Sequence, residues 1–145
     1  MGTICFVILN YKTWREAAAC AESILKTQQG QDIRIVLVDN GSGNGSEESL
    51  REEFAGEKRV HVIASEKNLG FARGNNLGIR YARSHFEPDF IVAANSDIIF
   101  EQEDYCEKLR EIYKEERFDI LGGDIVDASR TRPVSYTHLR AHETE

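Results

Sequence analysis

An Asn-x-Asp sequence follows directly after an apolar run in the second half of the chain. The run Phe90–Ala94 has no charged residue, and Asn95 and Asp97 come immediately after it. Residues two apart in an extended chain point the same way, so we expect both side chains to face one site. The carboxylate oxygens of Asp97 and the amide oxygen of Asn95 suit a hard divalent cation, which can in turn bridge to a diphosphate. The alternative is a helix N-cap before a helix over residues 102–116.

Polar residues also follow the other apolar runs. Asp39 comes directly after Ile33–Val38 and precedes a turn rich in Gly, Ser and Asn, which can expose backbone donors. Its carboxylate can accept a hydrogen bond from a ribose hydroxyl or a base N–H, or it can form an Asx-turn that holds its own loop. Tyr11 offers a flat ring for stacking on a nucleobase, or it packs at a helix N-terminus.

A third group of candidate residues surrounds the start of a predicted helix. Gly70 and Gly74 permit close approach of the backbone. Arg73 is a cation near the helix N-terminus, where a phosphate is favourable, although such an arginine can equally be a solvated surface residue. Asn75 and Asn76 can cap the helix or contact a ligand.

Apolar runs of strand length alternate with amphipathic helical patterns. Strands are predicted at Thr3–Leu9, Ile33–Val38, Val60–Ala64 and Phe90–Ala94, with a fifth candidate at Asp119–Asp127 broken by Gly122-Gly123. Helices are predicted from Trp14 to about Gln29, after a Thr13/Glu16 capping box, and at Glu47–Ala55, Ala72–His85 and Gln102–Glu116. The alternation predicts an α/β fold with a doubly wound, mainly parallel sheet that binds ligands at its carboxyl edge.

Composition narrows the function further. The 145 residues suffice for one domain, and a net charge of −7 without a basic stripe argues against a nucleic-acid partner.

The cysteines Cys5, Cys20 and Cys106 lie far apart and are interpreted as reduced core thiols. No apolar run reaches membrane-spanning length and there is no secretory signal, so we expect a cytoplasmic protein.

Two common nucleotide-binding motifs are missing. The dinucleotide fingerprint G-x-G-x-x-G would follow the first strand, where this chain has Asn10-Tyr-Lys-Thr13, and no P-loop sequence occurs. No Ser/His/Asp catalytic set stands out either, because His61 and His85 are the only histidines before residue 134.

The last residues differ in character from the rest. The segment 134–144 shows neither helical nor strand periodicity and resembles one reading frame of a transposase-type sequencing adapter. We therefore expect residues 1–132 to be the native part and residues 133–145 to be a non-native tail, with the natural protein continuing beyond residue 132.

Five blocks of the sequence together resemble family 2 glycosyltransferases, in order and in spacing. The blocks are Val7–Tyr11, Val38–Ser42, Asn68–Gly78, Asn95–Asp97 and Leu121–Gly123. The chain looks most like the rhamnosyltransferase-type branch. The resemblance covers residues 3 to about 130 and implies the nucleotide-sugar-binding half of a GT-A fold, truncated at the C-terminus.

The resemblance also implies roles for single residues. The residue matching Asp39 binds the base or ribose, the one matching Tyr11 lies against the base, and Asp97 would bind Mg²⁺ or Mn²⁺ against the diphosphate. Asn95-Ser-Asp97 lies at the position of the family's metal-binding D-x-D motif. Asn95 replaces the first aspartate of that motif, and one fewer carboxylate suggests weaker metal binding. The further residues expected to contact the nucleotide-sugar are Asn10, Asn40, Arg73, Asn76 and Asn95 itself.

We therefore predict the donor-binding part of an inverting glycosyltransferase of cell-envelope polysaccharide biosynthesis. The full enzyme would transfer sugar from a UDP- or dTDP-sugar to a hydroxyl of a glycan or lipid-linked acceptor. Its acceptor region and general base are expected beyond this chain, so the fragment itself is expected to be inactive. In the full-length protein the domain could be associated with a membrane, although this fragment has no transmembrane segment.

Two alternatives remain open at this point. A nucleotidyltransferase would also be a metal-dependent enzyme, but it would require a Gly-rich loop bearing Arg or Lys after the first strand. Residues 10–13, which follow that strand here, do not form such a loop. A non-catalytic nucleotide-binding or flavodoxin-like module would need no base at all.

Overall fold

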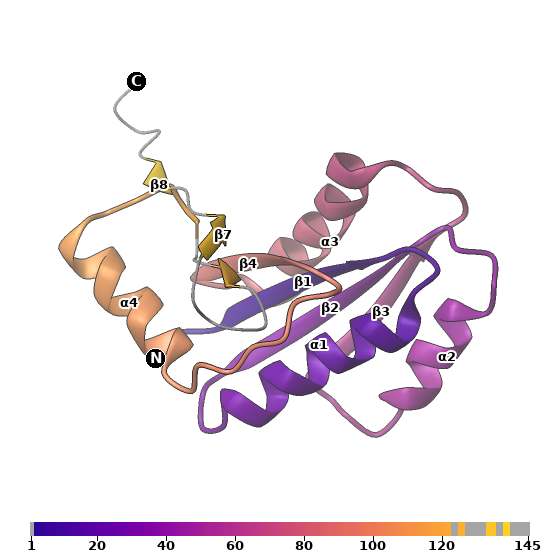
Figure 1. The fold of residues 1–145 in the computed structure, drawn as a ribbon, viewed down its shortest axis with the longest axis horizontal. Helices are drawn as coiled ribbons and strands as arrows, with labels where there is room; N and C mark the ends of the chain where they lie inside the picture. The colour runs from indigo at the N-terminus through magenta and orange to yellow at the C-terminus, as the bar shows by residue number, and fades with distance from the viewer. Residues whose placement is uncertain (1, 123–124, 127–132, 136–137, 140–145) are drawn as a thin grey trace. The chain divides into compact units, whose positions relative to one another are not determined.

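The computed structural model describes residues 2–122, 125–126, 133–135 and 138–139. The chain divides into two units, residues 1–106 and 107–145. The first unit holds the main sheet and the helices α1 to α3 (Figure 1). All of the residues expected to bind the nucleotide-sugar or the metal belong to this unit.

Four parallel strands form the sheet of the first unit, in the order β3-β2-β1-β4 (Figure 1). They are β1 (Ile4–Asn10), β2 (Ile33–Asn40), β3 (Val60–Ser65) and β4 (Phe90–Asn95). Each strand runs one or two residues further than predicted, so the polar residues expected in loops are the last residues of strands. Helices cover both faces of the parallel sheet, which confirms the predicted α/β class.

Helix α3 (Phe71–Phe86) lies against one face of the sheet, where two glycines face the strands. A Cβ atom on Gly78 would lie 2.5 Å from Val7 Cγ1 and 2.7 Å from Val38 Cγ2. A Cβ atom on Gly74 would lie 2.8 Å from a methyl carbon of Leu9. The close approach expected at Gly74 is therefore an approach of the helix to the sheet.

Helices α1 (Trp14–Thr27) and α2 (Ser46–Glu53) lie on the other side of the sheet (Figure 1). Thr13 is the N-cap of α1, as predicted, but the predicted capping box does not form, because the Thr13 side chain makes no capping hydrogen bond. The backbone N–H of Thr13 donates instead to Asn10 Oδ1, at 3.2 Å. The buried face of α1 consists mainly of small side chains, which let the helix approach the sheet: Ala17, Ala18, Cys20, Ala21 and Ile24.

Strand β4 is less buried than its apolar sequence suggested. Only Ala94 is buried, whereas Ala93 and Asn95 are exposed. The reason is topological, since β4 is the edge strand of the four-stranded sheet and pairs only with β1 there. A run of apolar residues cannot distinguish a central strand from an edge strand.

The second unit contains short elements. Helix α4 (Tyr105–Glu115) begins three residues later than predicted and continues into this unit. Two antiparallel pairs follow it, β5 (Ile120–Leu121) with β8 (His138–Leu139) and β6 (Ile125–Val126) with β7 (Pro133–Ser135). Strand β5 ends directly before Gly122, at the predicted break, whereas Gly123 lies outside the described residues. Strands β7 and β8 were not indicated by the aperiodic sequence, and residues 136–137 and 140–145 lie outside the described residues.

None of the helices that the structure describes is long and apolar enough to cross a membrane.

The three cysteines are free and buried, as predicted. Burial raises the pKa of both Cys5 and Cys20 to about 12, and the charge of Asp97 adds to the effect at Cys20. A thiol reagent attacks the thiolate, so a shift of this size suppresses labelling about 1,000-fold near pH 8. We expect both thiols to react with a disulfide reagent only in the unfolded protein, as mass spectrometry of the labelled peptides would measure. Rapid labelling of either thiol in the native protein would contradict the burial.

Candidate functional site

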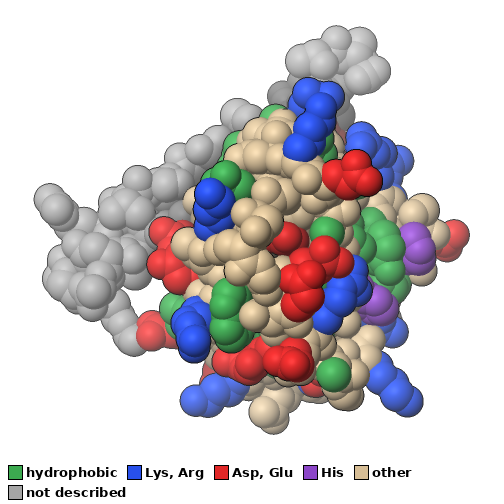
Figure 2. Space-filling model, turned by 90° about the vertical axis from the view of Figure 1, so that its right-hand side faces the viewer, with side chains coloured by type: hydrophobic (Ala, Val, Ile, Leu, Met, Phe, Trp, Pro, Cys, Tyr) green, Lys and Arg blue, Asp and Glu red, His purple; other side chains and the backbone are tan. Residues whose placement is uncertain are grey.

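The carboxyl edge of the sheet brings Asn10 and Asp39 together. These residues end neighbouring strands and are partners in the parallel register of β1 and β2. Both are buried, Asn10 completely and Asp39 with 4% of its surface exposed. Figure 2 views the side of the molecule that includes this edge and shows acidic side chains near its middle. The edge predicted from the sequence is therefore present, and Asp39 lies at the end of β2, one of its two central strands.

The Asp39 carboxylate is held by one of its two oxygens. Asn10 Nδ2 donates to Asp39 Oδ1 at 3.0 Å, and the Ser42 hydroxyl donates to the same oxygen at 2.5 Å. Ser42 Oγ in turn accepts a hydrogen bond from the backbone N–H of Lys12 at 2.8 Å. This network joins the loops after β1 and β2. Asp39 Oδ2 has no hydrogen-bond partner among the described residues, so the carboxylate can hold its loop and still accept from a ligand.

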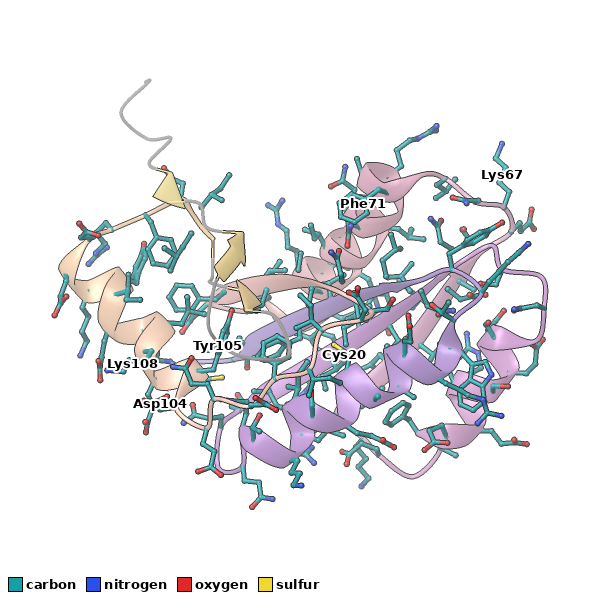
Figure 3. All side chains as sticks on the ribbon, viewed as in Figure 1. Cys20, Lys67, Phe71, Asp104, Tyr105 and Lys108 are labelled. Atoms are coloured by element: carbon teal, nitrogen blue, oxygen red, sulfur yellow. The ribbon has the colours of Figure 1, made fainter. Side chains whose placement is uncertain are left out.

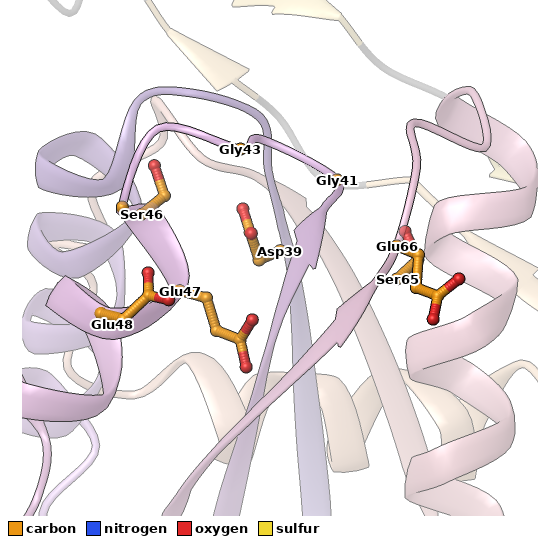
Figure 4. Close-up of a pocket in the computed structure, with 9 residues that line it drawn as sticks. Asp39, Gly41, Gly43, Ser46, Glu47, Glu48, Ser65 and Glu66 are labelled. Carbon is orange, nitrogen blue, oxygen red and sulfur yellow. The ribbon is translucent and has the colours of Figure 1, made fainter.

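A pocket of about 510 Å³ lies beside Asp39, between the loop after β2 and the end of β3 (Figure 4). None of the described residues that line it is a lysine or an arginine. The carboxylates on its wall suit ligand N–H and O–H donors and disfavour a phosphate. The lining residues are Asp39, Gly41, Gly43, Gly45, Ser46, Glu47, Glu48, Ser65 and Glu66.

Asn40 lies on the opposite face of the sheet from Asp39, because consecutive strand residues point to opposite faces. Its Nδ2 donates to Asn68 Oδ1 at 3.0 Å and to the carbonyl of Gly70 at 3.2 Å. Its Oδ1 accepts from the backbone N–H of Leu69 at 3.0 Å. The amide of Asn40 is therefore engaged on both sides in holding the loop that leads into α3.

Arg73 and Asn76 are both exposed on the first two turns of α3. The N-cap of this helix is Gly70, which has a φ of 87°, and no side chain caps the helix. Capping by Asn75 or Asn76 is therefore not observed. Asn75 is buried and donates to the carbonyl of Phe71 at 3.2 Å. Within residues 2–122, Arg73 takes part in no ion pair, which leaves its charge available to an anion.

Tyr11 lies at the rim of this edge with 42% of its surface exposed. The Nζ atom of Lys12 is 5.2 Å from the centroid of its ring. The ring is thus only partly covered by protein and has area left for stacking. Neither Tyr11 nor Arg73 lines the pocket beside Asp39.

Asn95 and Asp97 do not form the extended pair that their spacing predicts. Strand β4 ends at Asn95, and a turn follows in which the N–H of Ile98 donates to the Asn95 carbonyl at 3.2 Å. Both side chains are exposed. The N-cap alternative for Asp97 is wrong as well, since α4 begins only at Tyr105. The carboxylate is close enough to Cys20 to contribute to the raised pKa of that thiol.

The described residues contain no group of three or more His, Cys, Asp or Glu side chains that could hold a metal ion. Asp97 is therefore not part of such a cluster within the described part of the chain.

Sequence reasoning missed several residues of the site. Ser42 was not singled out, although a serine three residues after an aspartate is a common turn pattern. Glu47, Glu48 and Glu66 were also missed, because nothing in their local sequence separates a pocket wall from a solvated helix start. Their role depends on how two loops meet in space.

The chain matches the family described as Glycosyl transferase family 2 over residues 5–144. It is 33% identical over 121 residues to the glycosyltransferase GlyG of Streptococcus pneumoniae, covering 83% of this chain and 38% of GlyG. It is 27% identical over 113 residues to the low-salt glycan biosynthesis hexosyltransferase Agl10 of Haloferax volcanii, covering 78% and 32% of the two chains. The chain thus spans well under half the length of these relatives.

Solved structures share the fold at low sequence identity. One is S. aureus TarS 1-349 in complex with UDP-GlcNAc, with a TM-score of 0.71, 18% identity, and coverage of 90% of this chain and 37% of the TarS 1-349 chain. Another is the mannosyltransferase PcManGT from Pyrobaculum calidifontis in complex with GDP-Man and Mn²⁺, with a TM-score of 0.65, 14% identity, and coverage of 87% and 36%. These likenesses confirm the predicted GT-A type of α/β fold.

Proposed function

The chain belongs to glycosyl transferase family 2, and on this basis we propose that it forms the donor-binding part of an inverting glycosyltransferase of the rhamnosyltransferase-like branch. The observation that carries the proposal is the buried Asp39 carboxylate, which Asn10 and Ser42 hold by Oδ1 alone. A buried acceptor with an unused oxygen beside a pocket is suited to bind a polar ligand donor.

The donor would be a UDP- or dTDP-sugar. Asp39 Oδ2 accepts a hydrogen bond from a base N–H or a ribose hydroxyl, and the part-exposed ring of Tyr11 stacks on the base. The neighbouring structures of TarS with UDP-GlcNAc and of PcManGT with GDP-Man support a nucleotide-sugar as the ligand class. Asn10 acts by orienting Asp39, and Asn40 acts by holding the loop before α3.

The diphosphate would lie toward α3 and the turn after β4, away from the acidic pocket. Arg73 supplies a positive charge on the first turn of α3, where the helix dipole also favours an anion, and Asn76 supplies amide donors one turn later. Asp97 and Asn95 would hold Mg²⁺ or Mn²⁺ together with diphosphate oxygens. When bound, the cation offsets the negative charge that develops on the departing nucleoside diphosphate.

The transfer itself needs a base that activates the acceptor hydroxyl for attack on the sugar from the face opposite the diphosphate. We propose that this base and the acceptor site lie in the part of the protein that corresponds to the rest of the relatives. The 145-residue chain would then bind the donor without completing transfer. The acceptor would be a cell-envelope glycan or a lipid-linked glycan, reached from the cytoplasm or from the membrane surface.

The test is a calorimetric titration with UDP, dTDP and GDP, carried out with Mn²⁺ and again with EDTA. We expect UDP or dTDP to bind, more tightly with Mn²⁺. Asp97→Ala should remove most of the gain that Mn²⁺ provides, because it removes the only carboxylate proposed as a ligand. The affinity of this variant in EDTA should equal that of the wild type.

A control is Asp104→Ala, which removes a half-buried aspartate later in the same connecting segment. Its side chain accepts a hydrogen bond from Gln102 Nε2 at 2.9 Å and is not proposed as a ligand of the cation. Equal affinities with Mn²⁺ and EDTA in the wild type would exclude the metal role. Absence of binding by all three nucleotides would contradict the donor-binding proposal as a whole.

A further inference from the structure

The connection from β4 to α4 runs alongside α1, in the same direction as that helix. Figure 3 shows Cys20 of α1 beside the start of the connection and Tyr105 near its end. Two side chains of α1, and the side chain of its C-cap residue, contact the connection in order along the chain. The Cys20 thiol donates to the Asn95 carbonyl at 3.8 Å, and Ser23 Oγ accepts from the backbone N–H of Phe100 at 2.9 Å.

Gln28, the C-cap residue of α1, contacts the connection at two points. Its Nε2 donates to the Gln102 carbonyl at 2.7 Å, and its Oε1 accepts from the backbone N–H of Cys106 at 3.2 Å. The Gln28 side chain is completely buried. A buried amide satisfied at both ends holds its partners firmly, because breaking either bond would leave a buried polar group without a partner.

Each of these contacts reaches the backbone of the connection, whatever its side chains are. The rings of Phe100 and Tyr105 add an apolar anchor, since both pack against the buried Phe6 with centroid distances of 5.5 and 6.1 Å. The connection is thus fastened at Asn95, at Phe100 and from Gln102 to Cys106. Asp97 lies between the first two of these points.

We propose that Ser23 and Gln28 are positioning residues for the Asp97 carboxylate. Residues 98–104 form no helix or strand, so no regular backbone ladder sets their path. The side chains of Ser23 and Gln28 supply hydrogen bonds to the backbone of this segment. They thereby fix where the turn after β4 presents Asp97. The inference rests on the proposed function, in which Asp97 holds the cation against the diphosphate.

Groups that orient a metal ligand typically change metal affinity by about 10- to 100-fold when they are mutated. Ser23→Ala and Gln28→Leu should each lose about 10-fold of the Mn²⁺-dependent gain in affinity for whichever of UDP, dTDP and GDP binds the wild type. The affinity of both variants in EDTA should stay unchanged, because Asp39 and Tyr11 are not attached to this connection. A general loss of structure would lower both affinities alike.

The chain offers a matched control for each variant. Ser84→Ala removes a hydroxyl from α3 that donates to the carbonyl three residues earlier, as Ser23 does in α1. Gln29→Leu changes the exposed neighbour of Gln28. Both controls should keep the full effect of Mn²⁺.

Hydrogen exchange at the Phe100 and Cys106 amides provides a readout that needs no ligand. We expect faster exchange at Phe100 in Ser23→Ala and at Cys106 in Gln28→Leu. Faster exchange together with loss of the Mn²⁺ effect supports the inference. Faster exchange with the Mn²⁺ effect intact overturns it and leaves the proposed function standing. A wild type without any Mn²⁺ effect instead refutes the metal role of Asp97, and the inference falls with it.

Discussion

Replacement of Asp39 by alanine is expected to weaken nucleotide binding about 10- to 100-fold, both with Mn²⁺ and in EDTA. The physical reason is that a hydrogen bond to a charged group contributes about 1.5–3 kcal/mol, and each 1.4 kcal/mol changes affinity about tenfold. The carboxylate is 4% exposed, so water does not readily replace the lost acceptor. Calorimetric titration of the same nucleotides under both conditions measures the effect.

The Asp39 side chain also holds two loops, and this second role must be separated from binding. Ser42→Ala removes one hydrogen bond to Oδ1 and leaves the carboxylate in place. It should lower the free energy of unfolding by about 1 kcal/mol and change nucleotide affinity much less than Asp39→Ala does. If Asp39→Ala lowers stability by a similar amount but binds nucleotide normally, the carboxylate is only a loop-holding group.

The sheet could be predicted because its signals are local. The runs at β1 and β2 are apolar at nearly every position, as strands covered on both faces must be, and the residues that end them are polar. Parallel strands place their carboxyl ends at one edge, and Asn10 and Asp39 are register partners there.

The parts that escaped prediction depend on contacts between distant residues. Gln28 and Cys106 are 78 positions apart, and no local pattern marks a C-cap glutamine as the anchor of a later segment. Asp39 and Asn40 point to opposite faces of the sheet because β2 continues to Asn40. The sequence placed the end of that strand two residues too early, because polar residues usually signal a loop.

The largest stability effect is expected for Gly41→Ala, in the turn directly after β2. Gly41 has a φ of +70°, and a Cβ atom there would lie 2.2 Å from the carbonyl carbon of Lys67 and 2.5 Å from the backbone N of Asn68. The left-handed backbone costs an alanine roughly 1–2 kcal/mol. Displacing a packed backbone adds about 1–3 kcal/mol, as overpacking does elsewhere. Chemical denaturation should therefore show a loss of about 2–5 kcal/mol.

Gly43→Ala separates the two contributions, because Gly43 has a nearly equal φ of +68° and a Cβ atom there would meet nothing within 4 Å. It should lose only the backbone part, about 1–2 kcal/mol. The clash at Gly41 pushes on the loop that Asn40 holds before α3, so Gly41→Ala should also weaken nucleotide binding through a displaced Arg73. Equal stability losses in the two variants would show that the loops after β2 and β3 are not packed as tightly as the structure indicates.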